Sequence, residues 1–186
     1  MSHFPLHTTD SAPEGARDLL KGARQKLGFV PNLYGHLAEA PAALEAYFDL
    51  SALFDKTSFT PVERQVVLLA TSVANGCEFC VAAHSMIALK MAGAAAEVVD
   101  ALRGEATIPD KRLDELAAFT RTVVSQRGWV PEGELDRFLA AGFTKQQAIE
   151  VVLGVAMKTL SNYTNHITGT ATNPEFGDFA WSHRQS

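Results

Sequence analysis

The sequence predicts a single all-α domain of about eight helices spanning residues 1–186, and three observations indicate it. Apolar residues recur at helical spacing along most of the chain, no segment alternates polar and apolar residues over a useful length, and no hairpin signal is present. With 47% hydrophobic and 20% charged residues, the chain is too apolar to be disordered. A chain of 186 residues also buries enough surface to fold without a disulfide scaffold.

Helix boundaries follow from proline, glycine and capping residues. We expect helices at residues 13–27, 33–39, 41 to beyond 50, 61–74, 77–91, 94–102, 111–126, 132–140 and 144–166. Gly28 ends the first helix, Pro41 occupies the first turn of the third, and Gly93 stops the helix that begins at residue 77. Thr144 and Gln147 are spaced as a capping box and open the last and longest helix.

The helix at residues 61–74 is expected to lie at the centre of the fold. Thr60 is its N-cap, Pro61 its first residue and Glu63 the third residue of a capping box. Most of its surface is apolar, which is typical of a helix surrounded by others.

The sequence has two cysteines, and they carry the candidate chemistry. Cys77, Cys80 and His84 are three and four residues apart, so a helix places all three on one face. The Asn-Gly break before Cys77 puts both thiols in the first turns of the helix, where unpaired N–H groups and the helix dipole favour a thiolate. We expect His84 to lower the thiol pKa further by taking up a proton. Such a pair can cycle between dithiol and disulfide through a sulfenic intermediate.

Other interpretations of the cysteines stay open. Free cysteines are often small buried apolar residues. Cys77, Cys80 and His84 are also zinc ligands, and His166 is the candidate for a fourth. A thioredoxin-like site requires a strand before the motif, and none precedes Cys77.

Glu63 also has two interpretations. As the third residue of its helix it closes the capping box on Thr60. It also lies on the inward stripe of that helix, where an unpaired carboxylate is costly. With the cysteine motif one helix later, we expect Glu63 to lie beside His84 and relay a proton.

Charge and hydropathy exclude several classes of partner. The chain has 16 Lys and Arg against 21 Asp and Glu, for a net charge of −5, and it contains no basic run. This excludes nucleic acid and an anionic membrane as main partners. The N-terminal segment MSHFPLHTTD lacks the features of a secretory signal, and no apolar stretch is long enough to span a bilayer. The sequence predicts a soluble, cytoplasmic protein.

Two segments resemble a known family. TPVERQVVLLATSVANGCEFCVAAHSMIALKMAG resembles the core signature of the AhpD-like alkylhydroperoxidases, within the carboxymuconolactone decarboxylase superfamily. The upstream segment GFVPNLYGHLAEAPAALEAYFDL is similar to the stretch that precedes this core in the peroxidase-related branch. Together they cover residues 28–93. Phe79 stands where many members carry a second histidine between the cysteines.

The resemblance implies an all-helical fold and thiol-dependent reduction of hydroperoxides without a bound cofactor or metal. It assigns Cys80 as the peroxidatic thiolate, Cys77 as the resolving thiol, and His84 with Glu63 as the proton relay. It implies an external dithiol reductant, either a lipoyl-type group or a thioredoxin-like protein. The alternative hypothesis is a non-enzymatic helical assembly protein that senses redox state or holds zinc.

We also predict a homo-oligomer. The helices at 61–74 and 144–160 are apolar over more than one face, and Phe176, Phe179 and Trp181 add apolar surface in the C-terminal tail. The resemblance implies trimers or hexamers. We expect the tail to serve association rather than the cysteine chemistry.

Overall fold

A computed structural model describes residues 3–183, and within that range the chain is all helical, as predicted. Its elements are α1 (Glu14–Leu27), α2 (Asn32–Leu37), α3 (Pro41–Phe54), α4 (Pro61–Ala74), α5 (Glu78–Ile87), the π-helix η1 (Ala88–Ala92), α6 (Ala96–Arg103), α7 (Lys111–Ser125), α8 (Glu132–Ala140), α9 (Lys145–Thr168) and the 3₁₀-helix η2 (Pro174–Phe179). No helix in this part of the chain combines the length and apolar character that a membrane crossing requires.

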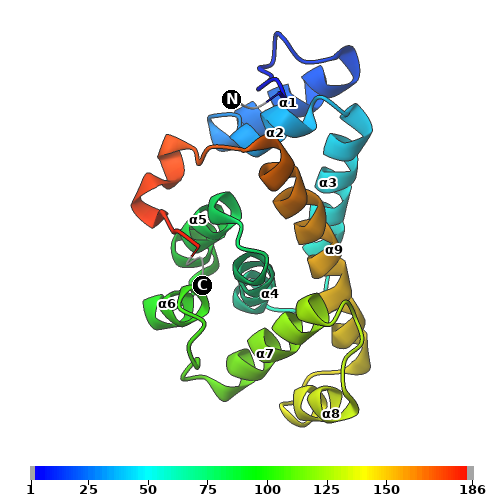
Figure 1. The fold of residues 1–186 in the computed structure, drawn as a ribbon, viewed down its shortest axis with the longest axis vertical. Coiled ribbons are helices and arrows are strands. Elements are labelled where there is room, and N and C mark those ends of the chain that lie inside the picture. The colour runs from blue at the N-terminus through cyan, green and yellow to red at the C-terminus, as the bar shows by residue number, and fades with distance from the viewer. Residues whose placement is uncertain (1–2, 184–186) are drawn as a thin grey trace.

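Helix α4 lies at the centre of the molecule (Figure 1), as its composition predicts. It packs against α5, α6, α7 and α9, and Val66 to Val73 are all buried. The predicted capping box is complete: the Thr60 side chain accepts from the Glu63 backbone N–H, and the Glu63 side chain accepts from the Thr60 backbone N–H. Local sequence therefore fixes where this helix begins, and burial on nearly every face fixes where it sits.

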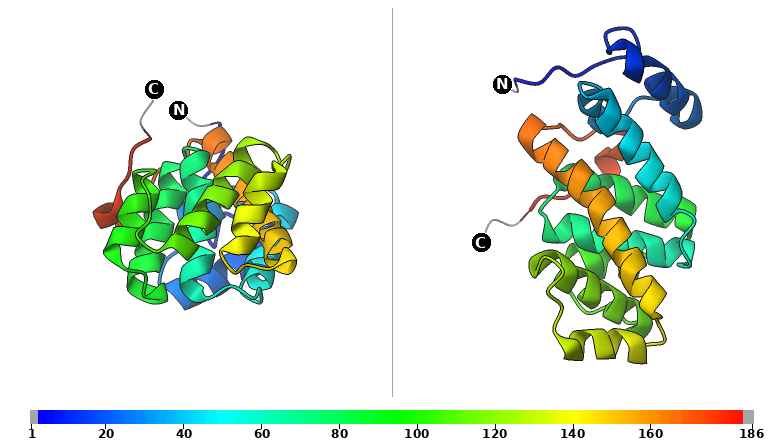
Figure 2. Two further views of the ribbon diagram at one scale, coloured as in Figure 1. Left: turned by 90° about the horizontal axis from the view of Figure 1, so that it is seen from below. Right: turned by 90° about the vertical axis from the view of Figure 1, so that its right-hand side faces the viewer.

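Helix α9 crosses the molecule and contacts α2, α3, α4 and α5 (Figure 2). Its predicted capping box, Thr144 with Gln147, is also complete. Gly154 lets the helix approach its neighbours closely, because a Cβ there would lie 2.8 Å from side-chain atoms of both Phe54 and Val67. This contact sets the position of α9, whose C-terminal half then lies opposite the start of α5.

The turn between α4 and α5 sets the direction of the cysteines. Gly76 has a φ of 66°, a conformation that glycine adopts at little cost. Cys77 follows as the N-cap of α5, with its N–H donating to the Ser72 carbonyl and its own carbonyl accepting from Val81. The predicted helix at 77–91 is therefore α5 continued by one π-helical segment, which ends at Gly93.

The C-terminal tail folds back on the molecule, and we call residues 173–183 the C-terminal strap. Phe176 is buried between Phe29 and Phe79, with ring centroids 5.7 Å away in each case. The aromatic rings of the strap cover the outer side of α5 in the same chain, and the expected role of the tail in association stays a prediction. The strap is coloured red in Figure 1.

Arg103 fastens the strap to the core. Its guanidinium donates to the backbone carbonyls of Phe179 and Ala180, and also to the hydroxyl of Ser85 on α5. Trp181 returns a hydrogen bond from its ring N–H to the Arg103 carbonyl. These hydrogen bonds tie the strap to α5 and α6. Although the strap is far from the cysteines in sequence, it therefore lies close to the cysteine segment in space.

Candidate active site

Cys77 and Cys80 lie together at the start of α5 and face α9. Both are free thiols, only 1% and 2% exposed. The side-chain N–H group of Asn165 donates to both sulfurs, with Nδ2 3.5 Å from Cys77 Sγ and 3.3 Å from Cys80 Sγ. Ser161, one turn earlier on α9, has its Oγ 3.9 Å from Cys80 Sγ. The two sulfurs therefore share one polar patch on an otherwise apolar helix face.

The two thiols have opposite pKa shifts. Burial by itself would raise the pKa of Cys80, but the hydrogen bond from Cys77, the positive charge of Lys158 and the contact with Ser161 outweigh it and lower this pKa to about 5. The hydrogen bond with Cys80, together with burial, raises the pKa of Cys77 well above its usual range. At neutral pH, Cys80 is a thiolate and Cys77 a thiol, which is the pairing that a nucleophile and a resolving partner need.

Lys158, on α9, provides the positive charge in this site. Its side chain is fully buried, and its Nζ lies 2.9 Å from His84 Nε2. His84 Nδ1 lies 3.0 Å from the side-chain oxygen of Gln65, which can only accept. His84 therefore carries its proton on Nδ1 and accepts from the lysine ammonium at Nε2.

Burial, followed by the charge of Lys158, lowers the pKa of His84 well below its usual value. The imidazole is neutral at neutral pH, because a second positive charge in this enclosure would be repelled by the ammonium. The expectation that His84 lowers the thiol pKa by taking up a proton is not met in this structure, because the interactions that lower the pKa of Cys80 come from Cys77, Lys158 and Ser161.

Two phenols complete the surroundings of the thiolate. Tyr34 on α2 and Tyr47 on α3 have ring centroids 5.7 Å apart. Burial is the main cause that raises the pKa of both hydroxyls, and the negative charge of Cys80 raises both further. Both phenols therefore stay protonated and lie within the electrostatic reach of the Cys80 sulfur.

Asn165 offers one further polar group to this enclosure. Its side-chain oxygen is buried and has no hydrogen-bond partner among the described residues. Because buried carbonyl oxygens are nearly always paired, Asn165 Oδ1 is the available acceptor for an O–H group beside the sulfurs.

Comparisons with known proteins identify the family of this chain. The carboxymuconolactone decarboxylase family model matches residues 38–110. An uncharacterized peroxidase-related protein from Ralstonia eutropha JMP134, with an alkylhydroperoxidase AhpD core, is 30% identical, with 94% of each chain covered and a TM-score of 0.82. The chain belongs to the AhpD-like branch of the carboxymuconolactone decarboxylase superfamily.

More distant structures share the AhpD-like fold. A peroxidase-related protein from Silicibacter sp. TM1040 is 17% identical, with 94% of this chain and 92% of that chain covered and a TM-score of 0.79. The debrominase Bmp8, solved with 2,3,4-tribromopyrrole, is 19% identical, with 96% and 97% covered and a TM-score of 0.76. No curated protein sequence matches the chain.

In this AhpD-like protein, Glu63 does not lie beside His84. One oxygen of its carboxylate accepts from the Thr60 backbone N–H at 2.8 Å, and the other accepts from Arg112 Nε at 2.9 Å. Both ring nitrogens of His84 are held by Gln65 and Lys158. The expected contact is therefore wrong: Glu63 is directed toward α7, and Gln65, two residues later, reaches the histidine.

We expect Glu63→Gln to affect stability and leave thiol reactivity unchanged. Glutamine keeps the cap on Thr60 but gives Arg112 a neutral partner, and since Arg112 is partly exposed, the loss should be about 1 kcal/mol of unfolding free energy. Denaturant unfolding and Cys80 alkylation measure the two effects. Glu115→Gln, in the looser 3.9 Å pair with Arg137, is the matched control and should cost less. A fall in turnover of about 100-fold with intact folding would instead place Glu63 in the proton relay.

The zinc site with His166 as fourth ligand is also not formed. His166 is exposed and stacks on Tyr163, whereas Asn165, the preceding residue, turns toward the sulfurs. Within residues 3–183, no three His, Cys, Asp or Glu side chains are grouped to hold a metal ion. An amide in the fourth position is a poor zinc ligand, so the donors present do not fit a structural zinc centre.

Several site residues escaped the sequence analysis because they lie far from the cysteines in the chain. They are Tyr34, Tyr47, Gln65, Lys158, Ser161 and Asn165. For the residues on α9, the sequence does contain a usable indication. Positions 158, 161 and 165 lie on the same buried helix face as Val151 and Gly154. A lysine on the buried face of a helix is rare unless it is paired, so it marks a candidate functional site.

Proposed function

We propose that this AhpD-like protein is a thiol-dependent oxidoreductase that reduces hydroperoxides, using Cys80 as nucleophile and Cys77 as resolving thiol. The observation that carries the proposal is a pair of buried thiols that share the Asn165 amide. The buried Lys158 lowers the pKa of Cys80, whereas the pKa of Cys77 is raised. The role is that of a peroxidase and antioxidant enzyme. The ordinary reductants of this cycle are dithiols, so we place the protein in the reducing environment of the cytoplasm.

In the first half of the cycle, the Cys80 thiolate attacks the terminal oxygen of the hydroperoxide. The O–O bond breaks, Cys80 becomes a sulfenic acid, and the other oxygen leaves as an alkoxide. Lys158 gives that alkoxide a proton and becomes a neutral amine, while the alcohol leaves. Tyr34 and Tyr47, both protonated, donate hydrogen bonds to the same developing charge.

In the second half, the Cys77 thiol attacks the sulfenic sulfur. A disulfide forms and the sulfenic oxygen leaves as water with the proton of Cys77. An external dithiol, of lipoyl type or on a thioredoxin-like protein, then reduces the disulfide to two thiols. Cys80 returns its proton to Lys158 and is again a thiolate. His84, neutral and anchored on Gln65, positions the lysine throughout.

A second candidate reaction is reductive dehalogenation, favoured by the structural similarity to the debrominase Bmp8. Here the Cys80 thiolate attacks the bromine of a bromoaromatic ring, and a nearby phenol gives a proton to the ring carbon. The resulting sulfenyl bromide is resolved by Cys77 to the same disulfide, with release of bromide and a proton.

One experiment separates these functions. The reduced protein is mixed with one equivalent of hydrogen peroxide, cumene hydroperoxide or 2,3,4-tribromopyrrole, and thiols, alcohol and bromide are measured. We expect each equivalent of hydroperoxide to consume two thiols per chain, and cumene hydroperoxide to yield one equivalent of its alcohol together with one of water. Bromide release without hydroperoxide consumption would support the second candidate. No oxidation by either, or stoichiometric zinc in the purified protein, would support the non-enzymatic alternative.

We also propose that the protein associates with copies of itself through α9. Ile149, Val152, Tyr163 and Ile167 are exposed and follow one another at helical spacing along one face of that helix. We expect light scattering to give a mass above that of a single chain, and Ile149→Lys with Ile167→Lys to reduce it. Leu53→Lys, which removes an exposed leucine on α3, is the matched control. A wild-type mass equal to one chain would contradict the proposal.

A further inference from the structure

Buried thiols require a route by which a substrate can reach them. Cys77 and Cys80 are almost fully covered, yet the proposed reaction brings an organic molecule to Cys80. Three surface hollows among the described residues are candidates for this route. One lies between α1 and α3, one at the N-terminal segment, and one under the C-terminal strap.

The first hollow, which we call the α1–α3 pocket, has a volume of about 390 Å³. Its wall is mostly apolar and is formed by Leu19, Gly22, Ala23, Leu27, Tyr34 and Phe48. Charged side chains, Asp18, Lys26 and Asp55, stand among its lining residues. Both the volume and the apolar wall are typical of small-molecule sites.

Tyr34 connects this pocket to the thiols. Its ring is half-buried and lines the pocket, packed edge-to-face on Phe48 with centroids 5.0 Å apart. On its other side the same residue adjoins the fully packed Tyr47, and its hydroxyl is within electrostatic reach of Cys80 and Lys158. Tyr34 is therefore shared by the pocket wall and the Tyr34–Tyr47 pair that faces the thiol site.

We propose that the α1–α3 pocket receives the uncharged apolar group of the substrate, and that the Tyr34 side chain is the gate through which the reacting atom reaches Cys80. The inference rests on the proposed thiol chemistry. An aryl or branched alkyl group fits the apolar wall, whereas a charged group would have to leave water for it. Movement of one ring about its χ angles opens the passage without displacing a helix.

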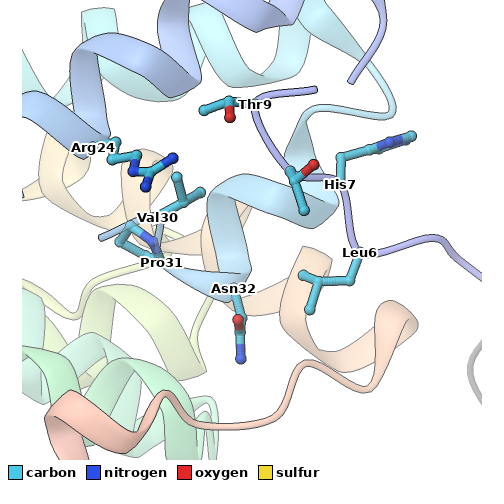
Figure 3. Close-up of a pocket in the computed structure, with 8 residues that line it drawn as sticks. Leu6, His7, Thr9, Arg24, Val30, Pro31 and Asn32 are labelled. Carbon is cyan, nitrogen blue, oxygen red and sulfur yellow. The ribbon is translucent and has the colours of Figure 1, made fainter. Parts of the chain in front are cut away.

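The other two hollows are less suited to this role. The N-terminal hollow, of about 270 Å³, lies between Leu6, His7 and Arg24 (Figure 3). Polar groups around it bond to Glu39 and to Asn173 of the strap rather than to the thiol site. The hollow under the strap, of about 440 Å³, is lined by Arg103, Trp181 and His183. The strap covers the side of α5 that carries Glu78 and Phe79, whereas the sulfurs face α9.

Filling the pocket tests the inference. Gly22 lies on α1, and a Cβ added there would meet nothing within 4 Å, so Gly22→Phe extends a ring into open space and also improves helix propensity. Gly133 on α8 is equally open and far from the pocket, which makes Gly133→Phe the matched control. Rates of Cys80 alkylation by iodoacetamide and by the bulkier N-phenylmaleimide report access without requiring catalysis.

We expect Gly22→Phe to lower the ratio of the N-phenylmaleimide rate to the iodoacetamide rate by about tenfold or more, and Gly133→Phe to leave it unchanged. Tyr34→Ala, which removes the gate, should raise the same ratio. An unchanged ratio in both Gly22→Phe and Tyr34→Ala would overturn the inference. In turnover, Gly22→Phe should raise the KM for cumene hydroperoxide and spare hydrogen peroxide. If the wild type turns over neither, the proposed function fails while the alkylation ratio still decides the pocket.

Discussion

In the Cys80→Ser variant, hydroperoxide turnover should fall to the uncatalysed rate, a loss of about three orders of magnitude or more. Cys80 is the thiol whose pKa lies near 5, so at neutral pH it alone carries the negative charge that attacks oxygen. A serine hydroxyl has no comparable acidity, and Cys77, buried and without a second thiol, cannot complete the disulfide cycle. Steady-state consumption of cumene hydroperoxide with a dithiol reductant measures the effect.

Cys77→Ser should behave differently, because the first step of the cycle does not use Cys77. One equivalent of hydroperoxide should still react, and Cys80 should stop at the sulfenic acid or oxidise further. Intact-mass spectrometry distinguishes the products: wild type loses two hydrogen atoms, whereas Cys77→Ser gains one or more oxygen atoms. Oxidation of Cys77 in the Cys80→Ser variant, with Cys80 untouched in Cys77→Ser, would reverse the two assignments.

The fold was largely predictable because its helices carry their own boundary signals. Thr60 with Glu63 and Thr144 with Gln147 form the two capping boxes as expected, and the apolar surface of α4 correctly indicates its central place. The spacing of the cysteines likewise predicts that both face the same neighbour. The capping boxes and the cysteine spacing depend on only a few residues of local sequence, and the place of α4 follows from apolar residues along the whole helix.

The partners of the thiols were harder to predict because they come from other helices. Glu63 and Gln65 both lie near the start of α4, and helical periodicity does not reveal which one faces His84. The answer depends on Arg112, which arrives from α7 and binds the glutamate. The side chain of a buried carboxylate points toward the cation that pairs with it. Its orientation therefore depends on which helix supplies that cation, and not on the periodicity of its own helix.

The C-terminal strap shows the same limit for apolar residues. An aromatic side chain such as Phe176 is expected to be buried. The sequence does not reveal whether the surface that buries it belongs to the same chain or to another chain. Here Phe79 supplies it, from the position between the two cysteines. Phe79, which departs from the family pattern inside the motif, is therefore one of the residues that hold the strap against α5.

Replacing Lys158 by Met should raise the pH at which Cys80 becomes reactive. In wild type the pKa of Cys80 is about 5, so its thiolate persists down to about that pH. The alkylation rate should therefore be nearly constant from neutral pH to pH 6 and should fall as the pH drops through about 5. Without the ammonium, the hydrogen bond from Cys77 and the contact with Ser161 still oppose burial, but less strongly, so the pKa of Cys80 should rise toward the ordinary thiol range of about 8.5. The midpoint of the rate–pH curve should therefore move up, by about one unit or more.

The size of the rate change depends on pH, because a more basic thiolate is also a better nucleophile. The loss should be clear at about pH 5.5 and become small above about pH 8, so the whole profile is the required measurement. Folding should be retained, since Met fills a similar volume and removes a buried charge. Lys90→Met, at an exposed lysine beyond the end of α5, is the matched control and should leave the midpoint unchanged. If Lys158→Met keeps the wild-type midpoint while His84→Ala raises it, the histidine rather than the lysine stabilises the thiolate.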